Sequence, residues 1–356
     1  MGLSKRMGWP YYLLFLAVFI LFPFSLFQYT KYILFLVNMT AIGVIGALGL
    51  NILTGYTGLI SLGQAGFMGV GAYTVAILGT KAGLPMWINL PAAGVITTLV
   101  GIIVGTPSLR LKGFYLAMST LAAEFLLEYV FKNWESMTQG VQGLFITPPQ
   151  IFGVHINNDR VFYFLSVSLA VLGVIGTHNL FRTKVGRAFI AIRDRDIAAE
   201  LIGINVFKYK LVSFAISSFY AGVAGGLWCY YMTIINPEAF QLSISIDYVA
   251  MIIVGGMGTL YGSVYGAIFV VLLPEAIQRL MDVLQQVLHM EYTFAAFKQI
   301  VFGVIIVIFL VFEPKGLSEI FSRLGNRISN RKGKEAIQDE SLPGREKPMN
   351  RKEGSL

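Results

Sequence analysis

Apolar runs of about 18 or more residues recur along this chain, and a run of that length is what a helix needs to cross a bilayer. Only helices and closed barrels satisfy every backbone group in lipid, and these runs lack the alternation of barrel strands. The chain is 56% hydrophobic and 13% charged, which is too little charge for the surface of a soluble protein of this size. The sequence therefore predicts an all-α polytopic membrane protein.

The apolar runs divide the chain into a predicted set of crossings. The predicted spans cover residues 11–27, 32–53, 59–79, 88–106, 114–131, 161–180, 211–232 and 293–312. A further run, Ser245–Leu273, would be roughly 40 Å long as one helix against a hydrocarbon core of about 30 Å, and Gly255, Gly256 and Gly258 interrupt it. We expect two short helices that enter the membrane and return, because broken helices are tolerated where they line a cavity or lie within protein. The prediction is about eight full transmembrane helices plus a broken re-entrant pair.

Lys and Arg are concentrated near the two ends of the chain and in a few loops, and this sets the predicted orientation. Lys5 and Arg6 precede the first run, and the stretch after Phe312 is basic. Both termini are therefore predicted to be cytoplasmic, and the net charge of +8 needs no nucleic acid to explain it. We expect a transmembrane domain over residues 1–320, an extracytoplasmic loop over 132–160, a cytoplasmic loop over 181–210 and a disordered charged tail over 326–356.

The predicted cytoplasmic loop, Phe181–Lys210, is a dense charged stretch between apolar runs. Within it, Asp196 can cap a short helix that continues through Ile202, and Gly203 can end that helix. We therefore expect one short helix here, exposed on the cytoplasmic side and available for docking.

Small residues recur at every fourth position in three places. The rows are Ser61, Ala65 and Gly69; Ser218, Gly222 and Gly226; and Gly258, Gly262 and Gly266. Each row lets the backbones of neighbouring helices approach closely, and ordinary tight packing explains all three. In the alternative interpretation, the first and third rows border a substrate path, because paired Gly-dense segments point to transport sites. These segments are Gly58–Ala72, which includes Gly66, and Gly255–Ala267.

A few polar residues fall within predicted spans. Glu128 can form an ion pair with Lys132 at the membrane edge, which is a structural role. Glu124 lies one turn deeper, where an ionisable group is a functional candidate by default. A hydrogen-bonded Glu that locks helices together is an equally good interpretation, and Asn51 and Gln64 carry the same ambiguity.

No catalytic, cofactor or metal site is evident in the sequence. The histidines, His155, His178 and His289, share no ligand spacing, and the single cysteine, Cys229, cannot form an internal disulfide. The chain has no G-x-x-x-x-G-K-[ST] phosphate loop, so it is not expected to hydrolyse ATP by itself. The sequence therefore predicts a chain that is not an enzyme.

Five segments in the same order carry a family resemblance. They are LNILTGYTGLISLGQAGFMGVGAY (50–73), SLRLKGFYLAMSTLAAEFLLE (108–128), GRAFIAIRDRDIAAELIGINVFKYKLVSFAISSFYAGVAGGL (186–227), VGGMGTLYGSVYGA (254–267) and FEPKGL (312–317). Together they resemble the LivM-type permease of branched-chain amino acid ABC transporters. Urea and short-chain amide permeases are similar, so the resemblance specifies the family better than the substrate.

The resemblance implies a type II-like ABC importer permease in a bacterial or archaeal cytoplasmic (inner) membrane. Its implied partners are a homologous LivH-like permease, two cytoplasmic ABC ATPase subunits, an extracytoplasmic solute-binding protein, an amino-acid substrate and membrane lipid. The predicted loop helix would be the coupling helix that seats in an ATPase groove. ABC permeases often carry E-A-A-x-x-x-G there, and this chain keeps the two alanines and the glycine but has Ile197 in place of the Glu.

The candidate residues fall in two regions, a coupling helix that the resemblance implies and a substrate path that the Gly-dense segments and polar residues suggest. The coupling candidates are Arg193, Arg195, Asp196, Ala198, Ala199, Glu200 and Gly203, with the charged members as substitutes for the missing Glu. The substrate-path candidates are Asn51, Ser61, Gln64, Gly66, Glu124, Gly255, Gly256 and Gly258. Two other functions stay open: a secondary transporter driven by an ion gradient, with Glu124 as its proton site, and a non-transporting scaffold.

Overall fold

The computed structural model describes residues 30–146, 150–151, 154–155, 159–288, 295–312 and 316–320. The predicted first span, 11–27, and the predicted tail, 326–356, lie outside these residues. The elements are α2 (Thr30–Leu50), the π-helix η1 (Asn51–Tyr56), α3 (Gln64–Lys81), α4 (Met86–Ser108), α5 (Phe114–Asn133), α6 (Glu135–Thr138), the 3₁₀ helix η2 (Gly140–Gln142), β1 (Leu144–Phe145), β2 (Gln150–Ile151), β3 (Val154–His155), α7 (Asp159–Arg182), α8 (Lys184–Asp194), α9 (Asp196–Leu201), α10 (Val206–Met232), β4 (Ile234–Ile235), the 3₁₀ helix η3 (Pro237–Phe240), α11 (Leu242–Gly255), α12 (Leu260–Leu288) and α13 (Ala295–Phe312).

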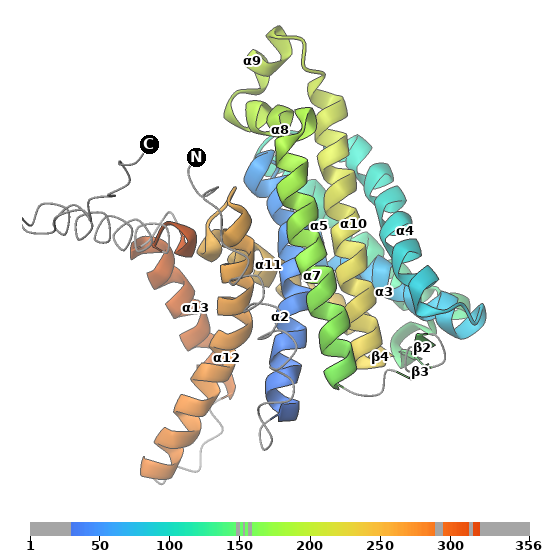
Figure 1. Cartoon of the computed structure of the whole chain (residues 1–356), viewed down its shortest axis with the longest axis vertical. Helices are drawn as coiled ribbons and strands as arrows, with labels where there is room; N and C mark the ends of the chain where they lie inside the picture. Colours follow the sequence, from blue (N-terminus) through green and yellow to red (C-terminus); the bar gives the residue numbers. More distant parts are fainter. Residues whose placement is uncertain are drawn as a thin grey trace, which may run out of the picture.

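The chain folds as a helical membrane bundle, as predicted. Seven helices among the described residues are long and apolar enough to cross a membrane. Figure 1 shows α2, α7 and α10 as long neighbouring helices, with α4 on one flank and α12 and α13 on the other. The α8 and α9 helices lie beyond one end of the bundle, and the small strands lie at the opposite end.

The core of the bundle lies around α3, which packs against α10, α4 and α5. All residues from Gln64 to Ala76 are buried. Gly222 and Gly225 of α10 touch the α3 backbone, because a Cβ at Gly225 would overlap Met68 O and one at Gly71 would overlap the backbone of Gly222. The second small-residue row also packs against α4, and close helix packing therefore accounts for it.

The start of α3 differs from the prediction. The expected span at 59–79 begins as a helix only at Gln64, so Ser61 lies in a non-helical segment and shares no helix face with Ala65. The reason is Gly58, whose φ of +75° ends η1: its N–H bonds to Thr54 O, and Leu59 N–H bonds to Leu53 O.

The predicted interruption of the run at 245–273 is confirmed. α11 ends at Gly255, and α12 begins at Leu260 after a break at Gly256–Thr259, in which Gly256 and Gly258 have φ values of +115° and +74°. The second helix is longer than predicted and continues to Leu288. Both members of the pair, Pro237–Gly255 and Leu260–Met281, are long enough to cross a membrane, so they need not be re-entrant.

Two short antiparallel strand pairs close the end of the bundle opposite to α8 and α9 (Figure 1). In the first pair, Leu144 of β1 is paired with Ile235 of β4, which ties the segment after α5 to the segment after α10. The second pair joins β2 to β3 in a hairpin. The predicted outer loop at 132–160 therefore contains α6, η2 and three short strands rather than plain coil.

Candidate functional site

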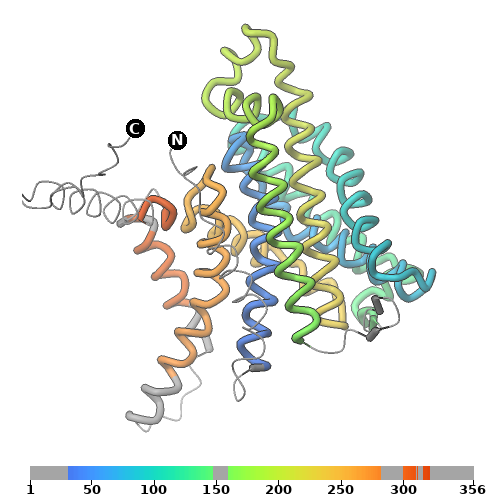
Figure 2. Tube along the Cα trace, in the orientation of Figure 1, coloured from blue at the N-terminus to red at the C-terminus, as the bar shows by residue number. Residues whose placement is uncertain are grey.

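The charged stretch at 181–210 contains two helices, α8 and α9, rather than the single helix predicted. Thr183 caps α8, because its Oγ1 accepts hydrogen bonds from Val185 N at 3.2 Å and Gly186 N at 3.4 Å. A threonine before a helical stretch is a recognisable start signal, and it would have revealed α8 in the sequence. In Figure 2 the trace of α9 extends past the ends of the neighbouring long helices, with α8 beneath it.

The end of α9 matches the prediction. Gly203 has a φ of +87°, its N–H bonds to Glu200 O at 2.9 Å, and Ile204 N–H bonds to Ala199 O at 3.0 Å. This pair of bonds is the Schellman arrangement, in which a left-handed glycine closes the last turn. The predicted Ala-Ala-x-x-x-Gly register therefore ends where expected, with Ala199 buried and Ala198 exposed.

The predicted cap by Asp196 is wrong. Asp196 is the first residue of α9, and no side-chain cap is formed at that helix start. Its Oδ2 instead lies 3.2 Å from Lys112 Nζ and 3.7 Å from Lys210 Nζ. The hydrogen bond from Lys112 and the charges of both lysines lower the pKa of the Asp196 carboxyl. Asp196 therefore ties α9 to the loop between α4 and α5 and to the start of α10.

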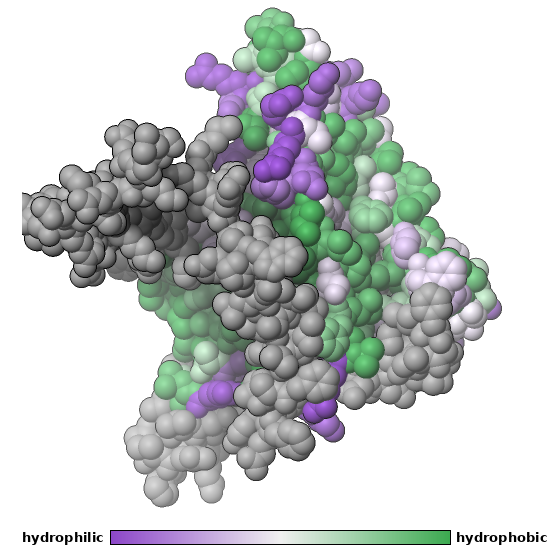
Figure 3. All heavy atoms as spheres, viewed as in Figure 1, coloured by the Kyte–Doolittle hydropathy of each residue, from purple (hydrophilic) through white to green (hydrophobic). Residues whose placement is uncertain are grey.

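The outer face of α9 is apolar. Ile197, Leu201 and Ile202 are 68%, 83% and 74% exposed. Figure 3 shows a hydrophobic tip at this end of the molecule, with hydrophilic residues beneath it. Arg193, Arg195 and Glu200 are also exposed. The position where a coupling helix usually has Glu is thus part of an exposed apolar group, which we call the α9 tip (Ile197, Leu201 and Ile202).

A pocket of about 220 Å³ lies at the base of α9. Its charged lining includes the Asp196 ion pairs with Lys112 and Lys210, together with Arg193. The remaining lining residues are Thr57, Gly58, Leu59, Leu111, Gly113, Leu116, Ile192, Asp194 and Arg195. Coupling candidates and the turn after η1 therefore line the same pocket.

The structure brings one coupling candidate into contact with the broken helix pair. Arg193 packs over Gly58, where an added Cβ would lie 3.5 Å from Arg193 Cγ. Its Nη1 lies against Gly258, so close that an added Cβ there would overlap it. The sequence placed Arg193 and Gly258 in separate groups, and nothing in their spacing signalled this contact.

Asn51 is the side chain that fastens η1 to the break between α11 and α12. Its Nδ2 donates to Thr259 O and to Ser263 Oγ, each at 2.8 Å. Its Oδ1 accepts from Gly258 N at 2.9 Å. The residue is 1% exposed, and these bonds use both amide hydrogens and the carbonyl oxygen. Asn51, Gly255, Gly256 and Gly258, predicted together from the sequence, therefore lie at one junction.

Glu124 belongs to a second buried group. It is 1% exposed, and its Oε2 accepts a hydrogen bond from Ser245 Oγ at 2.6 Å. Ser245 Oγ in turn accepts from Ala65 N at 2.8 Å, which links α5, α11 and the first turn of α3. The other oxygen, Oε1, has no hydrogen-bond partner among the described residues. Gly66 of α3 allows α5 to approach closely, because an added Cβ at Gly66 would lie 3.2 Å from Glu124 Cα.

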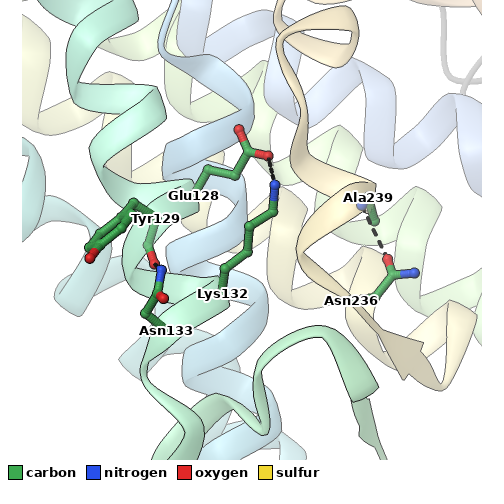
Figure 4. Close-up of polar contacts among 6 residues, drawn as sticks. All are labelled: Glu128, Tyr129, Lys132, Asn133, Asn236 and Ala239. Carbon is green, nitrogen blue, oxygen red and sulfur yellow. Dashed lines mark hydrogen bonds and ion pairs between the residues drawn. The ribbon is translucent and has the colours of Figure 1, made fainter.

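Other predicted polar residues have structural contacts. Gln64 Nε2 donates to Gly46 O at 3.0 Å, and Ser61 is buried beside Gly63 N. The predicted pair of Glu128 with Lys132 is confirmed at 2.6 Å (Figure 4). Ser245 was not singled out from the sequence. Its position as a polar residue at the start of an apolar run was the feature that could have identified it.

A further carboxylate within a candidate membrane span, that of Asp247, was not among the residues singled out from the sequence. Asp247 lies on α11 within the span Pro237–Gly255 and is half-buried. Within the part of the chain that the structure describes, no hydrogen bond or ion pair to its carboxylate is present. A charged residue within an apolar run could have identified Asp247 in the sequence. Asp247 lies on α11, the same helix as Ser245, and is a further ionisable group within a candidate membrane span, besides Glu124.

Comparisons with known proteins agree with this architecture. Residues 32–310 match the family described as "Branched-chain amino acid transport system / permease component". The LivM permease protein of the high-affinity branched-chain amino acid transport system of Salmonella typhimurium is 31% identical over 304 residues, covering 79% of this chain and 68% of the relative. The Escherichia coli LivM protein gives the same identity and coverage.

A more distant relative comes from an archaeon. The probable branched-chain amino acid transport permease protein LivH of Methanocaldococcus jannaschii is 29% identical over 238 residues, covering 63% of this chain and 73% of the relative. No solved structure gives a significant match. The length of the family match and the identity to the LivM proteins, together with the bundle and its broken helix pair, lead to one conclusion: the chain belongs to the permease-component family of branched-chain amino acid ABC transport systems.

Proposed function

We propose that this chain lines, together with a homologous LivH-like permease, the path by which branched-chain amino acids enter the cell. Two ABC ATPases supply the energy, and an extracytoplasmic binding protein delivers the substrate. The names of the relatives support this substrate class, since the LivM proteins of two bacteria match most of the chain. As a permease component, the chain itself is a transport subunit without a catalytic role.

The observation that carries the proposal is the way α9 is held. A helix that transmits force from a partner needs a free face for the partner and a firm attachment to the bundle. The α9 tip supplies the free face, with Leu201 83% exposed. The attachment is supplied by Asp196, which bridges Lys112 and Lys210 from two different parts of the bundle.

In this proposal the α8–α9 end of the bundle is cytoplasmic, and so are both termini. Arg182, Lys184 and Arg187 at that end support the orientation, because cytoplasmic loops are enriched in Lys and Arg. Closure of the ATPases would then displace α9, and the ion pairs of Asp196 would carry the displacement to α10 and to the loop before α5. The buried groups around Asn51 and Glu124 are the proposed borders of the substrate path.

Co-purification of the ATPases tests the docking. A Leu201→Asp variant places a charge at the centre of the α9 tip, where an ATPase groove would have to desolvate it. We expect this variant to lose ATPase subunits on purification while the two permeases stay together. Ile190→Asp is the matched control, since Ile190 is 40% exposed on α8 and outside the tip. Full retention of the ATPases by Leu201→Asp would overturn the docking assignment.

Substrate choice within the family needs its own test. Urea and short-chain amides are the competing substrates for such a permease. Excess unlabelled urea or acetamide should leave leucine uptake by the assembled transporter unchanged, whereas excess isoleucine or valine should suppress it. Suppression by the amides would assign the chain to the other substrate class.

A transporter driven by an ion gradient is the second candidate function. The buried Oε1 of Glu124 supports it, because a carboxylate oxygen without a described partner can exchange a proton. This function predicts that the chain alone, in liposomes with an imposed proton gradient, accumulates leucine. The absence of gradient-driven uptake by the chain alone, with uptake obtained once the LivH-like permease, the two ATPases, the binding protein and ATP are added, would exclude it.

A further inference from the structure

The end of η1 lies against the break that follows α11. η1 ends at Tyr56 and α11 ends at Gly255. A Cβ added at Gly55 would lie 2.5 Å from Gly258 N in the break, and one added at Gly258 would lie 2.8 Å from Gly55 O. The C-terminal end of a helix carries partial negative charge from its unpaired carbonyl groups, so a cation is stabilised there.

Arg193 supplies a cation at this meeting point. It lies in the last turn of α8, and its Cα and Cγ pack against Gly58. Its guanidinium lies on Gly258 within the α11–α12 break. Both glycines have positive φ values, +75° and +74°, a backbone conformation that strains any other residue. At Gly258 an added Cβ would also overlap the Arg193 guanidinium, so this glycine creates the room in which the guanidinium lies.

Arg193 is also connected to α9 through the backbone. A single residue, Arg195, separates α8 from α9, and its N–H bonds to Ala191 O while its carbonyl accepts from Ala199 N. The two helices are thus joined through backbone hydrogen bonds on both sides of Arg195. A displacement of α9 must move the end of α8, and with it the Arg193 side chain.

We propose that Arg193 is a positioning residue through which movement of α9 reaches the break between α11 and α12. This rests on the proposed function, in which α9 receives the ATPases. Because Asn51 Oδ1 accepts a hydrogen bond from Gly258 N, the movement also reaches η1, which precedes the turn at Gly58.

A thiol probe in the break tests this inference. Met257 lies in the break and is 47% exposed, while the native Cys229 is fully buried and should not react. The assembled transporter with Met257→Cys, containing both permeases, both ATPases and the binding protein, is labelled with a water-soluble maleimide. Labelling rates are compared without nucleotide and after trapping with ATP and vanadate. With Arg193 present, we expect the two rates to differ.

The arginine variants decide the outcome. Arg193→Met keeps much of the side-chain length but removes the charge, and we expect the ratio of the two rates to fall toward one, a loss of roughly two- to thirty-fold. Arg193→Lys should retain part of the ratio, because it keeps a cation at the helix ends without the planar fork. Arg187→Met is the control, an exposed arginine of α8, and should leave the ratio unchanged.

Two results would overturn the inference. One is an unchanged ratio in Arg193→Met, and the other is a ratio of one even with Arg193 in a complex that retains its ATPases. Failure of the proposed function would look different, because the ATPases would then not co-purify with the unmodified chain. A melting temperature measured for each variant shows that the loss reflects coupling rather than unfolding.

Discussion

Asn51 Oδ1 accepts a hydrogen bond from Gly258 N at 2.9 Å, across 207 positions of sequence. This bond joins the end of the first described span to the break in the α11–α12 pair. η1, which leads into the Gly-dense segment Gly58–Ala72, is therefore held to the Gly-dense segment Gly255–Ala267 by one buried amide. Replacing that amide should affect η1 and the break at once.

Removing the Asn51 amide should destabilise the chain. Asn51→Ala leaves Gly258 N–H and the partner oxygens of Thr259 and Ser263 without this side chain, and we expect a loss of about 1–3 kcal/mol in the free energy of unfolding. Thermal unfolding of the purified chain in detergent measures it. Asn133→Ala is the control, because among the described residues that exposed amide bonds to Tyr129 O alone, within its own helix (Figure 4). Equal losses in the two variants would contradict the role of Asn51.

Glu124→Gln separates a structural from a proton-carrying role. Glutamine keeps an oxygen that can accept the bond from Ser245, and it removes a carboxylate whose other oxygen has no described partner. We therefore expect stability within about 0.5 kcal/mol of the native chain, whereas Glu124→Ala should cost roughly 1–3 kcal/mol. Uptake of leucine by the assembled transporter should survive Glu124→Gln. Abolished uptake in a stably folded Gln variant would show that the proton is part of the mechanism.

Much of the bundle follows from the sequence because length and apolarity define a membrane helix. The runs at 32–53, 88–106 and 211–232 are helical in the structure. The glycines at 256 and 258 correctly predicted the position of the break, where both have positive φ values. Helix ends were harder to predict. The late start of α3 depends on the turn at Gly58, and the longer α12 includes polar residues beyond Leu273 that an apolar run does not contain.

The pH dependence of α9 follows from Asp196. Its pKa is lowered in the folded chain, so the ion pairs contribute fully above the ordinary aspartate pKa of about 4 and are lost only as the pH falls through the lowered value. Hydrogen exchange of the α9 amides, corrected for intrinsic rates, should therefore show constant protection from pH 5 to 8. Asp196→Asn should speed exchange roughly two- to fivefold throughout that range.

The matched control for this prediction is Asp194→Asn. Asp194 is exposed, and none of the ion pairs described in the structure involves it. Protection of α9 should be unchanged in this variant. If Asp194→Asn and Asp196→Asn exchanged alike, the attachment of α9 could not be assigned to Lys112 and Lys210.

Gly203 should tolerate asparagine better than alanine. No heavy atom lies within 4 Å of an added Cβ, so the cost of a side chain comes from its φ of +87° alone. Alanine in this conformation costs about 1–2 kcal/mol, while asparagine visits it more readily. The ratio of substrate moved to ATP hydrolysed should fall in Gly203→Ala and be largely retained in Gly203→Asn. Identical ratios would show that the Schellman end of α9 does not matter for coupling.

The contacts that define the candidate site could be predicted only in part. The Ala-Ala-x-x-x-Gly spacing gave the register of α9, since a glycine at a helix end is a local signal. The pairing of Asp196 with Lys112, the bond from Ser245 to Glu124 and the packing of Arg193 on Gly258 are long-range contacts. They depend on how helices cross in three dimensions, which no local pattern encodes.

ATP-dependent leucine uptake into proteoliposomes tests the central claim most directly. The liposomes contain this chain, the LivH-like permease and the two ATPases, with the binding protein outside and ATP inside. We predict accumulation of leucine that requires ATP and the binding protein, and none by this chain alone under a proton gradient. Uptake by the chain alone, or uptake by the full assembly that is indifferent to ATP, would contradict the account.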